Sequence, residues 1–228
     1  MIRILSLLIF VIFSISFAET LFTDDFNDGN DDGWTHTGSA SYEVIDGEYF
    51  IYTQGEKGQG KSLNGDASGV MSTADYSILC SIVIECGLEG GILARYQGVD
   101  QWYYRVVVKP NSSRIFLERK NDSGPTMKLD EHNFTFAYGT RYWIRFQLEA
   151  DTVCCRIWPG IVEDEPSAWH LEAVDSIQQE PGSFGLIAGG YGKVSWSSVF
   201  DDIVVSTPVP EGFLQTTWAS VKCSGISL

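Results

Sequence analysis

Residues 141–159 constrain the fold most, because apolar and polar side chains alternate along two successive segments. A period of two predicts strands with one buried face. Residues 150–153 are a short enough connection to reverse the chain, which predicts an antiparallel hairpin. The buried face of this hairpin is expected to contain Tyr142, Ile144, Phe146, Leu148, Val153, Cys155 and Ile157.

The opposite face of the hairpin combines two indoles with guanidinium and amide groups, from Trp143, Arg145, Gln147, Arg156 and Trp158. Indoles stack on the C–H faces of sugars, while the polar groups hydrogen-bond to sugar hydroxyls. We therefore predict a carbohydrate-binding surface here. The alternative is the polar side of an ordinary sheet, with the tryptophans covered by residues 160–167 or by the C-terminal tail.

Turn chemistry separates many other short strands. The clearest case is the two-residue Asp46-Gly47 turn, which predicts a hairpin of residues 41–45 and 48–53. Residues 54–69 are Gly-rich and are expected to be a flexible loop. Further strands are expected at 21–26, 69–72, 76–86, 90–97, 101–109, 114–119, 126–130, 183–188 and 195–206. This pattern, without helical periodicity, predicts an all-β sandwich.

A second hairpin, turning at residues 98–100, supplies more candidate ligand-binding residues. Counting the register from that turn places Arg95 near Tyr104 and Leu93 near Val106, with Trp102 on the same face. A slip of one residue would reverse each of these assignments. We add Trp102, Arg95 and Tyr104 to the predicted glycan-binding set.

Both ends of the chain are expected to lie outside the domain. Residues 1–18 are typical of a secretory signal peptide, with Arg3, an apolar run over 4–13 and a small-x-small cleavage site at 16–18. The mature chain is therefore expected to be extracellular or periplasmic, with the domain spanning 19–206. Residues 207–228 are a linker and a tail whose apolar residues share one helical face; a docking helix and an export or attachment peptide remain alternatives.

Composition excludes some partners. The chain has 15 Lys and Arg against 30 Asp and Glu, a formal net charge of −15 at pH 7, and loss of Arg3 with the signal peptide makes it more negative. Such a field disfavours nucleic acid, anionic membranes and, less firmly, polyanionic glycans. A local pair of arginines could still bind an acidic sugar. Outside the signal peptide no stretch is long and apolar enough to span a bilayer.

The five cysteines leave at least one unpaired. Cys80 and Cys86 would lie about 20 Å apart on one extended strand, too far for a disulfide. Cys80 or Cys86 could pair with Cys155 across the core, while buried free thiols are the favoured interpretation.

Several short motifs, taken in order, resemble the concanavalin A-like lectin/glucanase superfamily, the jelly-roll group that includes laminin-G-like domains and many carbohydrate-binding modules. The motifs lie at residues 24–29, 33–34, 90–96, 103–104, 141–146, 182–186 and 200–204. The resemblance implies a two-sheet antiparallel jelly roll. It also implies that ligands bind on the concave sheet or in loops at its rim.

The resemblance further implies a structural calcium ion that joins the two ends of the domain. Its candidate ligands are Asp25 or Asp28 near the beginning and Asp202 in the closing Asp-Asp pair. The alternative for the acidic loop 27–34 is a solvated turn, in which Asp and Asn serve the turn geometry.

A catalytic motif is missing from the sequence. Related family 16 glycoside hydrolases use a Glu-x-Asp-x-x-Glu strand, whereas Glu149-Ala150-Asp151 is followed by no second Glu. We therefore predict a non-catalytic, lectin-like domain whose partner is a polysaccharide or glycan. The alternatives are an adhesion or structural domain that binds a cell-surface protein and, less favoured, a glycan-cleaving enzyme with a non-standard site.

Overall fold

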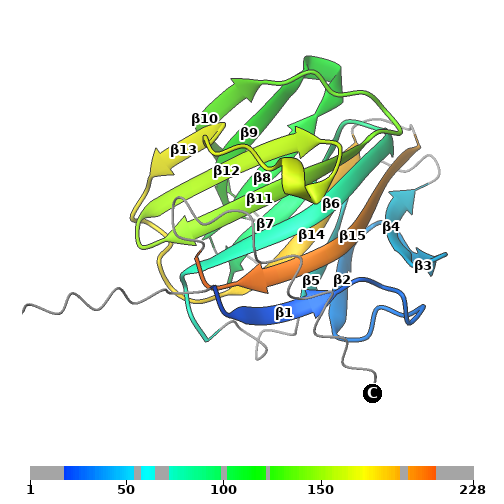
Figure 1. Ribbon diagram of the computed structural model, residues 1–228, viewed down its shortest axis with the longest axis horizontal. Coiled ribbons are helices and arrows are strands. Elements are labelled where there is room, and N and C mark those ends of the chain that lie inside the picture. The colour runs from blue at the N-terminus through cyan, green and yellow to red at the C-terminus, as the bar shows by residue number, and fades with distance from the viewer. Residues whose placement is uncertain are drawn as a thin grey trace, which may run out of the picture.

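The computed structural model describes residues 18–53, 58–64, 72–98, 102–121, 124–190 and 195–208. They form two antiparallel sheets packed face to face, a jelly-roll sandwich (Figure 1). The predicted signal peptide, apart from Ala18, and the predicted tail beyond residue 208 lie outside the described residues. No helix among the described residues is long and apolar enough to cross a membrane.

The first sheet has eight strands. Its order is β13 (Leu171–Val174), β12 (Thr152–Pro159), β11 (Arg141–Glu149), β6 (Tyr76–Cys86), β15 (Trp196–Ser206), β4 (Glu48–Thr53) and β3 (Ser41–Ile45), with β1 (Thr20–Asp24) also paired to β15. The first and last strands of the domain are therefore neighbours.

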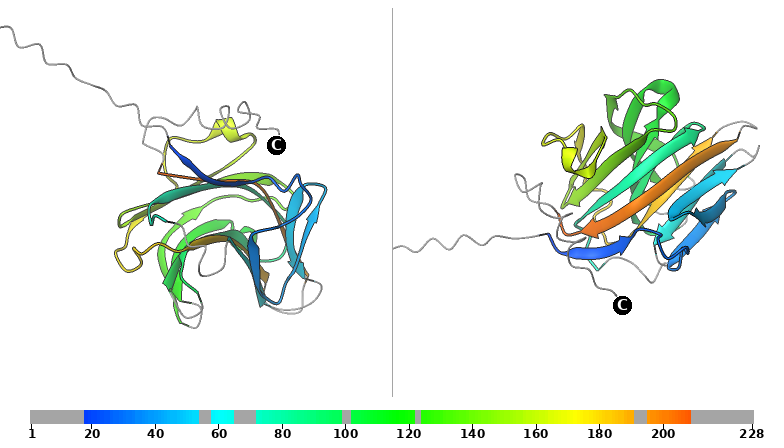
Figure 2. Two further views of the ribbon diagram at one scale, coloured as in Figure 1. Left: turned by 90° about the horizontal axis from the view of Figure 1, so that it is seen from below. Right: turned by 45° about the vertical axis from the view of Figure 1, so that its right-hand side comes forward.

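The second sheet has seven strands. Its order is β10 (Thr126–Asn133), β9 (Arg114–Asn121), β8 (Trp102–Lys109), β7 (Glu89–Tyr96), β14 (Ser183–Gly190), β5 (Gly58–Asn64) and β2 (Trp34–Gly38). A 3₁₀ turn, η1 (Pro110–Ser112), connects β8 to β9. This sheet arches, so that the face turned away from the core is concave (Figure 2). We call this outer face the concave face.

The predicted hairpins are confirmed. Strands β11 and β12 pair with Trp143 opposite Trp158, and their apolar residues enter the core between the sheets. Asp46 and Gly47 both have positive φ, 53° and 80°, as a type I′ turn requires. The alternation of apolar and polar residues therefore fixed both the hairpin and its buried face.

The sequence missed three strands, β2, β5 and β13. Strand β5 lies where a flexible loop was expected, because its glycines disguise it. Pairing with β14 on one side and β2 on the other supplies the hydrogen bonds that hold it. Tertiary pairing thus overrides a weak local propensity. The strand predicted at 69–72 falls almost entirely outside the described residues.

The described cysteines form no disulfide. Cys80 and Cys155 are fully buried in the core, and burial raises the pKa of the Cys155 thiol well above its usual range. These two thiols therefore pack as small apolar groups.

Candidate functional site

The residues of β11 and β12 that the sequence predicts as a binding surface lie side by side on one face of the sheet, but this face is covered by another segment of the chain. Trp143 pairs with Trp158 and Arg145 with Arg156. All four side chains, and that of Gln147, are at most 6% exposed. The segment that follows β12, which contains the 3₁₀ turn η2 (Val162–Asp164), lies over this face (Figure 2).

Glu165, in that segment, holds the two arginines. Arg145 donates to both of its carboxylate oxygens, at 2.5 and 2.7 Å, and Nε of Arg156 lies 3.1 Å from it. Arg156 also donates to the carbonyls of Pro166 and Ser167. Residues 160–167 therefore cover this face, as the alternative interpretation of the sequence expects.

The indoles of Trp143 and Trp158 also form hydrogen bonds within the protein. Nε1 of Trp143 donates to the carbonyl of Gly160 at 3.2 Å, and Nε1 of Trp158 donates to that of Ile161 at 3.0 Å. The guanidinium of Arg156 stacks on Trp169, 3.6 Å from the ring centre. The prediction that this face is exposed is wrong, because its own loop occupies it.

The second predicted group, Arg95, Tyr104 and Trp102, lies on the core side of the seven-stranded sheet. The observed register pairs Ala94 with Tyr104 and Leu93 with Arg105, so the placement of Leu93 beside Val106 is wrong. Arg95 still approaches the Tyr104 ring, at 5.9 Å, because its positive φ of 51° interrupts the strand.

Arg95 is a fully buried structural anchor. Its guanidinium donates to the carbonyls of Ala74, Gln178 and Ala150 and to the carboxylate of Asp75. These partners join three separate loops at one end of the sandwich. Each of its three nitrogens donates to a group of the protein itself, which argues against a role in ligand binding.

Tyr104 and Trp102 also have internal partners. The hydroxyl of Tyr104 donates to Asp175, and burial raises the pKa of Tyr104 to about 12. Trp102 lies under the guanidinium of Arg119, which in turn pairs with Asp175. The expectation that these residues present themselves to a glycan is therefore not supported by their positions.

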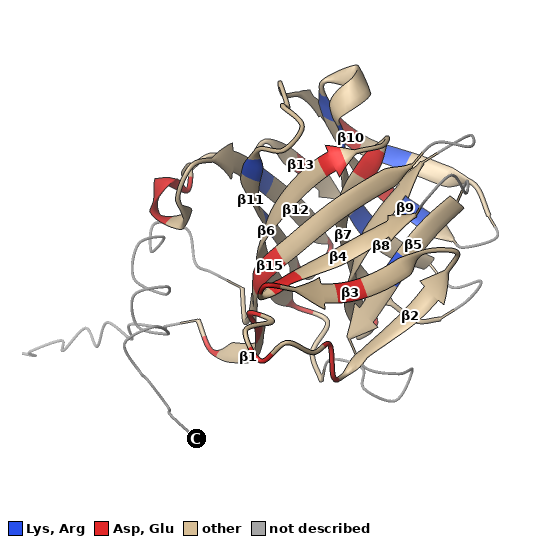
Figure 3. Ribbon diagram, turned by 90° about the vertical axis from the view of Figure 1, so that its right-hand side faces the viewer, with Lys and Arg blue, Asp and Glu red and all other residues tan. Residues whose placement is uncertain are grey.

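The proposed calcium ligands lie at the acidic end of the sandwich, where β1 and β15 are neighbours (Figure 3). Asp25 and Asp28 each accept a backbone N–H from two residues further along the loop, as in Asx turns. Within the described ranges, no group of three or more His, Cys, Asp or Glu could hold a metal ion.

Asp202 adjoins a half-buried acid. Burial, followed by the neighbouring Asp202, raises the pKa of Asp201 to about 6. Arg141 is the nearest cation, 3.7 Å from Asp201, and it also pairs with Glu48. The acidic end is thus partly neutralised by an arginine from the protein itself.

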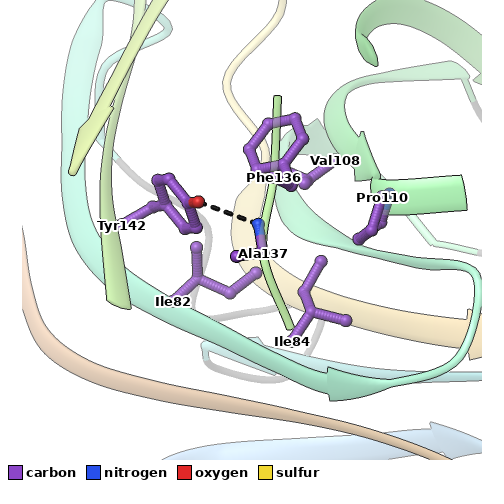
Figure 4. Close-up of a pocket in the computed structure, with 7 residues that line it drawn as sticks. All are labelled: Ile82, Ile84, Val108, Pro110, Phe136, Ala137 and Tyr142. Atoms are coloured by element: carbon purple, nitrogen blue, oxygen red, sulfur yellow. Dashed lines mark hydrogen bonds between the residues drawn. The ribbon is translucent and has the colours of Figure 1, made fainter. Parts of the chain in front are cut away.

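A small apolar cavity lies in the core beneath the connection between β10 and β11. Its volume is about 10 Å³, and Ala137 N–H donates to the Tyr142 hydroxyl beside it (Figure 4). The lining residues are Ile82, Ile84, Val108, Pro110, Phe136, Ala137 and Tyr142. Such a space is no larger than a water molecule needs, so it is a packing defect and not a ligand site.

The concave face has a different composition. Its centre is an apolar floor separated from the main core, consisting of Leu63, Leu93, Tyr96, Tyr103, Val107 and Ile187 with Phe116 packed against it. The side chains belong to β5, β7, β8, β9 and β14, because alternate residues of these strands point away from the core.

A charge network crosses this floor. Arg105 donates to Glu118 at 2.7 Å and lies 3.6 Å from Glu89, while Lys109 lies within 3.6 Å of both carboxylates. Gln59 donates to Glu89. Burial lowers the pKa of Arg105, but the two carboxylates outweigh burial and raise it.

Two lysines stand over aromatic rings at the solvent side of the face. Nζ of Lys61 lies 5.5 Å from the ring centre of Tyr96 and 5.3 Å from that of Tyr103. Nζ of Lys109 lies 4.6 Å from the ring centre of Phe116. Both lysines and Phe116 are partly exposed. These groups can offer stacking and hydrogen-bond donors together.

Sequence reasoning missed this set although a signal was present. In β8, Arg105 and Lys109 occupy alternate positions facing away from the predicted core, and Glu118 lies opposite Arg105 in β9. The predicted register paired Leu93 with Val106, whereas the observed partner of Leu93 is Arg105, so the wrong face of β7 was predicted as the binding face. With the correct register, Arg105 and Glu118 would have been predicted as a pair on the outer face of the sheet.

No family model matches the chain, and no curated protein matches it. Solved structures do. The carbohydrate binding module CBM66 from Bacillus subtilis has a TM-score of 0.59 and 17% identity, covering 77% of this chain and 96% of that chain. The exoplasmic/lumenal domain of VIP36 in its Ca²⁺/Man3GlcNAc-bound form has a TM-score of 0.60 and 11% identity, covering 87% and 91%.

A prokaryotic β-1,3-1,4-glucanase (lichenase) derived from a mouse hindgut metagenome also matches, with a TM-score of 0.56 and 14% identity, covering 82% of this chain and 99% of that chain. At such identities the likeness is one of fold. The chain is a jelly-roll domain of the type shared by lectins, carbohydrate-binding modules and glucanases. It has the concanavalin A-like lectin/glucanase fold.

Proposed function

We propose that the protein is a secreted, non-catalytic carbohydrate-binding domain and that its glycan lies on the concave face. The observation that carries this proposal is the ion network of Glu89, Arg105, Glu118 and Lys109 on the outer side of a sheet. These charged side chains do not belong to the core between the sheets. Burying charged groups costs free energy, and buried charges that do not pack in a core are typical of functional sites.

The surroundings of the network fit a sugar. Partly exposed Phe116 offers a ring for stacking, and Gln59, Lys61 and Lys109 offer hydrogen-bond donors to hydroxyls. The apolar floor is buried, and Arg105 is held by Glu89 and Glu118. The site is therefore ordered before a ligand binds. A preformed site reduces the entropy that binding must overcome.

The three named neighbours support a glycan as the ligand class, since one is a carbohydrate binding module, one was solved with Man3GlcNAc and one is a glucanase. A lumenal neighbour also agrees with secretion, which the signal-like residues 1–18 predict. An adhesion domain for a protein partner remains the outcome to expect if no glycan binds.

Two glutamates on one face raise the possibility of hydrolysis, because glycosidases use a pair of carboxyl groups. Here Glu118 is held by Arg105, and both glutamates are next to Lys109. Both carboxylates are therefore occupied in ion pairs within the protein. Lichenan and β-glucan digests should therefore show no release of reducing sugar above that of the Glu118→Gln variant.

Binding can be tested by affinity electrophoresis against a panel of soluble polysaccharides. Phe116→Ala removes the ring from the concave face, and Tyr138→Ala removes an exposed aromatic from the loop between β10 and β11 as a control. We expect a ligand whose retardation is lost in Phe116→Ala and kept in Tyr138→Ala. Absence of binding to every polysaccharide, with a normal thermal transition, would contradict the proposal.

A further inference from the structure

The described strand residues of the concave face carry an excess of positive charge, although the whole chain is strongly acidic. Register with the core residues places six described cations on this face, Lys61, Arg105, Lys109, Arg114, Lys120 and Lys128. The same register places three described acids there, Glu89, Glu118 and Glu131. Bands of Lys and Arg are visible on β8 and β9 (Figure 3). Among the described strand residues, the charge of this face is therefore opposite in sign to that of the chain, whose formal net charge is −15.

Around the apolar floor, the lysines lie nearer to solvent than the carboxylates. The side chains of Glu89 and Glu118 are 3% and 7% exposed, and Arg105 neutralises them from within the sheet. Lys109 is 29% exposed, and Lys61 is partly exposed as well. Glu131, at the edge strand β10, is 35% exposed and is paired with Arg114 and Lys128. A ligand at the floor therefore meets ammonium groups before Glu89 and Glu118.

Arg105 also retains an unused donor. Its Nη1 is buried and makes no hydrogen bond, since the nearest carboxylate oxygen, of Glu89, is 3.6 Å away. A buried donor without an acceptor is costly, and an oxygen supplied by a ligand would satisfy it.

We propose that the glycan bound by the concave face is anionic and carries carboxylate or sulfate groups along the chain. The inference rests on the proposed function and specifies its ligand class. Lys61 and Lys109, which border the apolar floor, would pair with the anionic groups, while Phe116 contacts the sugar ring. Charge-assisted hydrogen bonds are about twice as strong as neutral ones and favour such a ligand over a neutral one.

The overall acidity of the protein does not forbid this ligand. Charges more than about 8 Å apart are largely screened at physiological ionic strength, whereas contacts on the face itself are screened less. The remote acids, such as those where β1 and β15 meet, slow the approach of a polyanion but do not remove the local contacts. Weak affinity with a clear salt dependence is the expected result.

The test compares two anionic arms with one neutral arm, using the full mature chain. Polygalacturonate and alginate carry carboxylates, chondroitin sulfate carries sulfates as well, and hydroxyethylcellulose, laminarin and mannan are neutral. We expect binding to at least one anionic polymer that weakens between about 50 and about 300 mM NaCl. The polymer that binds identifies which anionic group is recognised.

The variant Lys61→Gln/Lys109→Gln should weaken that binding by about tenfold or more, because two charge-assisted contacts are lost. Lys61→Gln alone serves if the double variant is unstable. Arg141→Gln makes the same change of charge on the eight-stranded sheet and should leave binding unchanged. Neutral polymers that bind better than anionic ones, through Phe116 and without salt dependence, would overturn the anionic ligand and leave the proposed function standing. Loss of anionic binding in Arg141→Gln to the same extent would also overturn it.

Discussion

Arg105 and Glu118 lie opposite each other on β8 and β9, with Nε and Nη2 of the guanidinium 2.7 and 2.5 Å from one carboxylate oxygen. Both side chains are nearly buried, although they point away from the main core. Replacing one partner of such a pair strands the charge of the other in a site with little water. The pair therefore links the stability of the sheet to the surface that we propose as the binding site.

Arg105→Met should destabilise the protein by about 3–5 kcal/mol at pH 7, because Glu89 and Glu118 remain buried with only Lys109 to neutralise them. Denaturant unfolding at pH 7 checks this. A loss as small as that of a surface ion-pair variant would contradict it.

Arg114→Met provides the matched control for that variant. Arg114 pairs with Glu131 at 3.2 Å, and both side chains are at least 35% exposed. Solvent screens a pair this exposed, so the loss of stability should be much smaller than that of Arg105→Met.

Glu165→Gln should release the segment that covers β11 and β12. The carboxylate neutralises Arg145 and Arg156, which are nearly buried, so its loss should destabilise the fold by about 3 kcal/mol. Limited proteolysis between residues 160 and 170 should become faster in this variant. Glu163→Gln, a change at an exposed acid of the same segment, should behave as the wild type. Equal protection of both variants would show that the ion pairs do not hold the loop.

Asp201→Asn should stabilise the protein at pH 7. The folded pKa of Asp201 is raised to about 6 from its usual 3.8, so its contribution to stability is full below about pH 4 and is lost as pH rises through 6. The variant cannot ionise, and we expect it to gain about 1–2 kcal/mol at pH 7 and nothing at pH 4. Urea midpoints at the two pH values measure the difference. An equal gain at both pH values would contradict this account of Asp201.

Calcium should not affect the thermal transition. Asp25, Asp28 and Asp202 belong to no group of three or more His, Cys, Asp or Glu that could hold a metal ion in the described part of the chain. We therefore expect chelator and added calcium to shift the melting temperature by less than about 1 °C. A rise of several degrees with millimolar calcium, abolished in Asp202→Asn, would restore the site that the family resemblance implies.

Much of the fold could be predicted from the sequence because the signals are local. Alternation at Tyr142, Ile144 and Phe146 defines a buried face, and the Asp46-Gly47 turn defines a register. Strand β5 could not be predicted in this way, because Gly58 and Gly60 lack strand propensity and only pairing with its neighbours creates the strand.

The prediction that the outer face of β11 and β12 is exposed is wrong for a different reason. The alternation that places Trp143 and Trp158 on the outer face does not report whether a distant segment returns to cover that face. Glu165 does so here, and nothing in the strand pattern announces it. On the concave face, the positions of Arg105 and Lys109 on one side of β8 could be predicted from the sequence. Lys61 and Phe116 join them only when β5 and β9 form one sheet.

The most direct test is amide chemical-shift mapping of the ¹⁵N-labelled domain with the polysaccharide that it binds best. The account predicts the largest shifts at Lys61, Tyr103 and Phe116, on β5, β8 and β9, and negligible shifts at Trp143 and Trp158 on β11 and β12. The opposite distribution, with the largest shifts on β11 and β12, would contradict a glycan on the concave face.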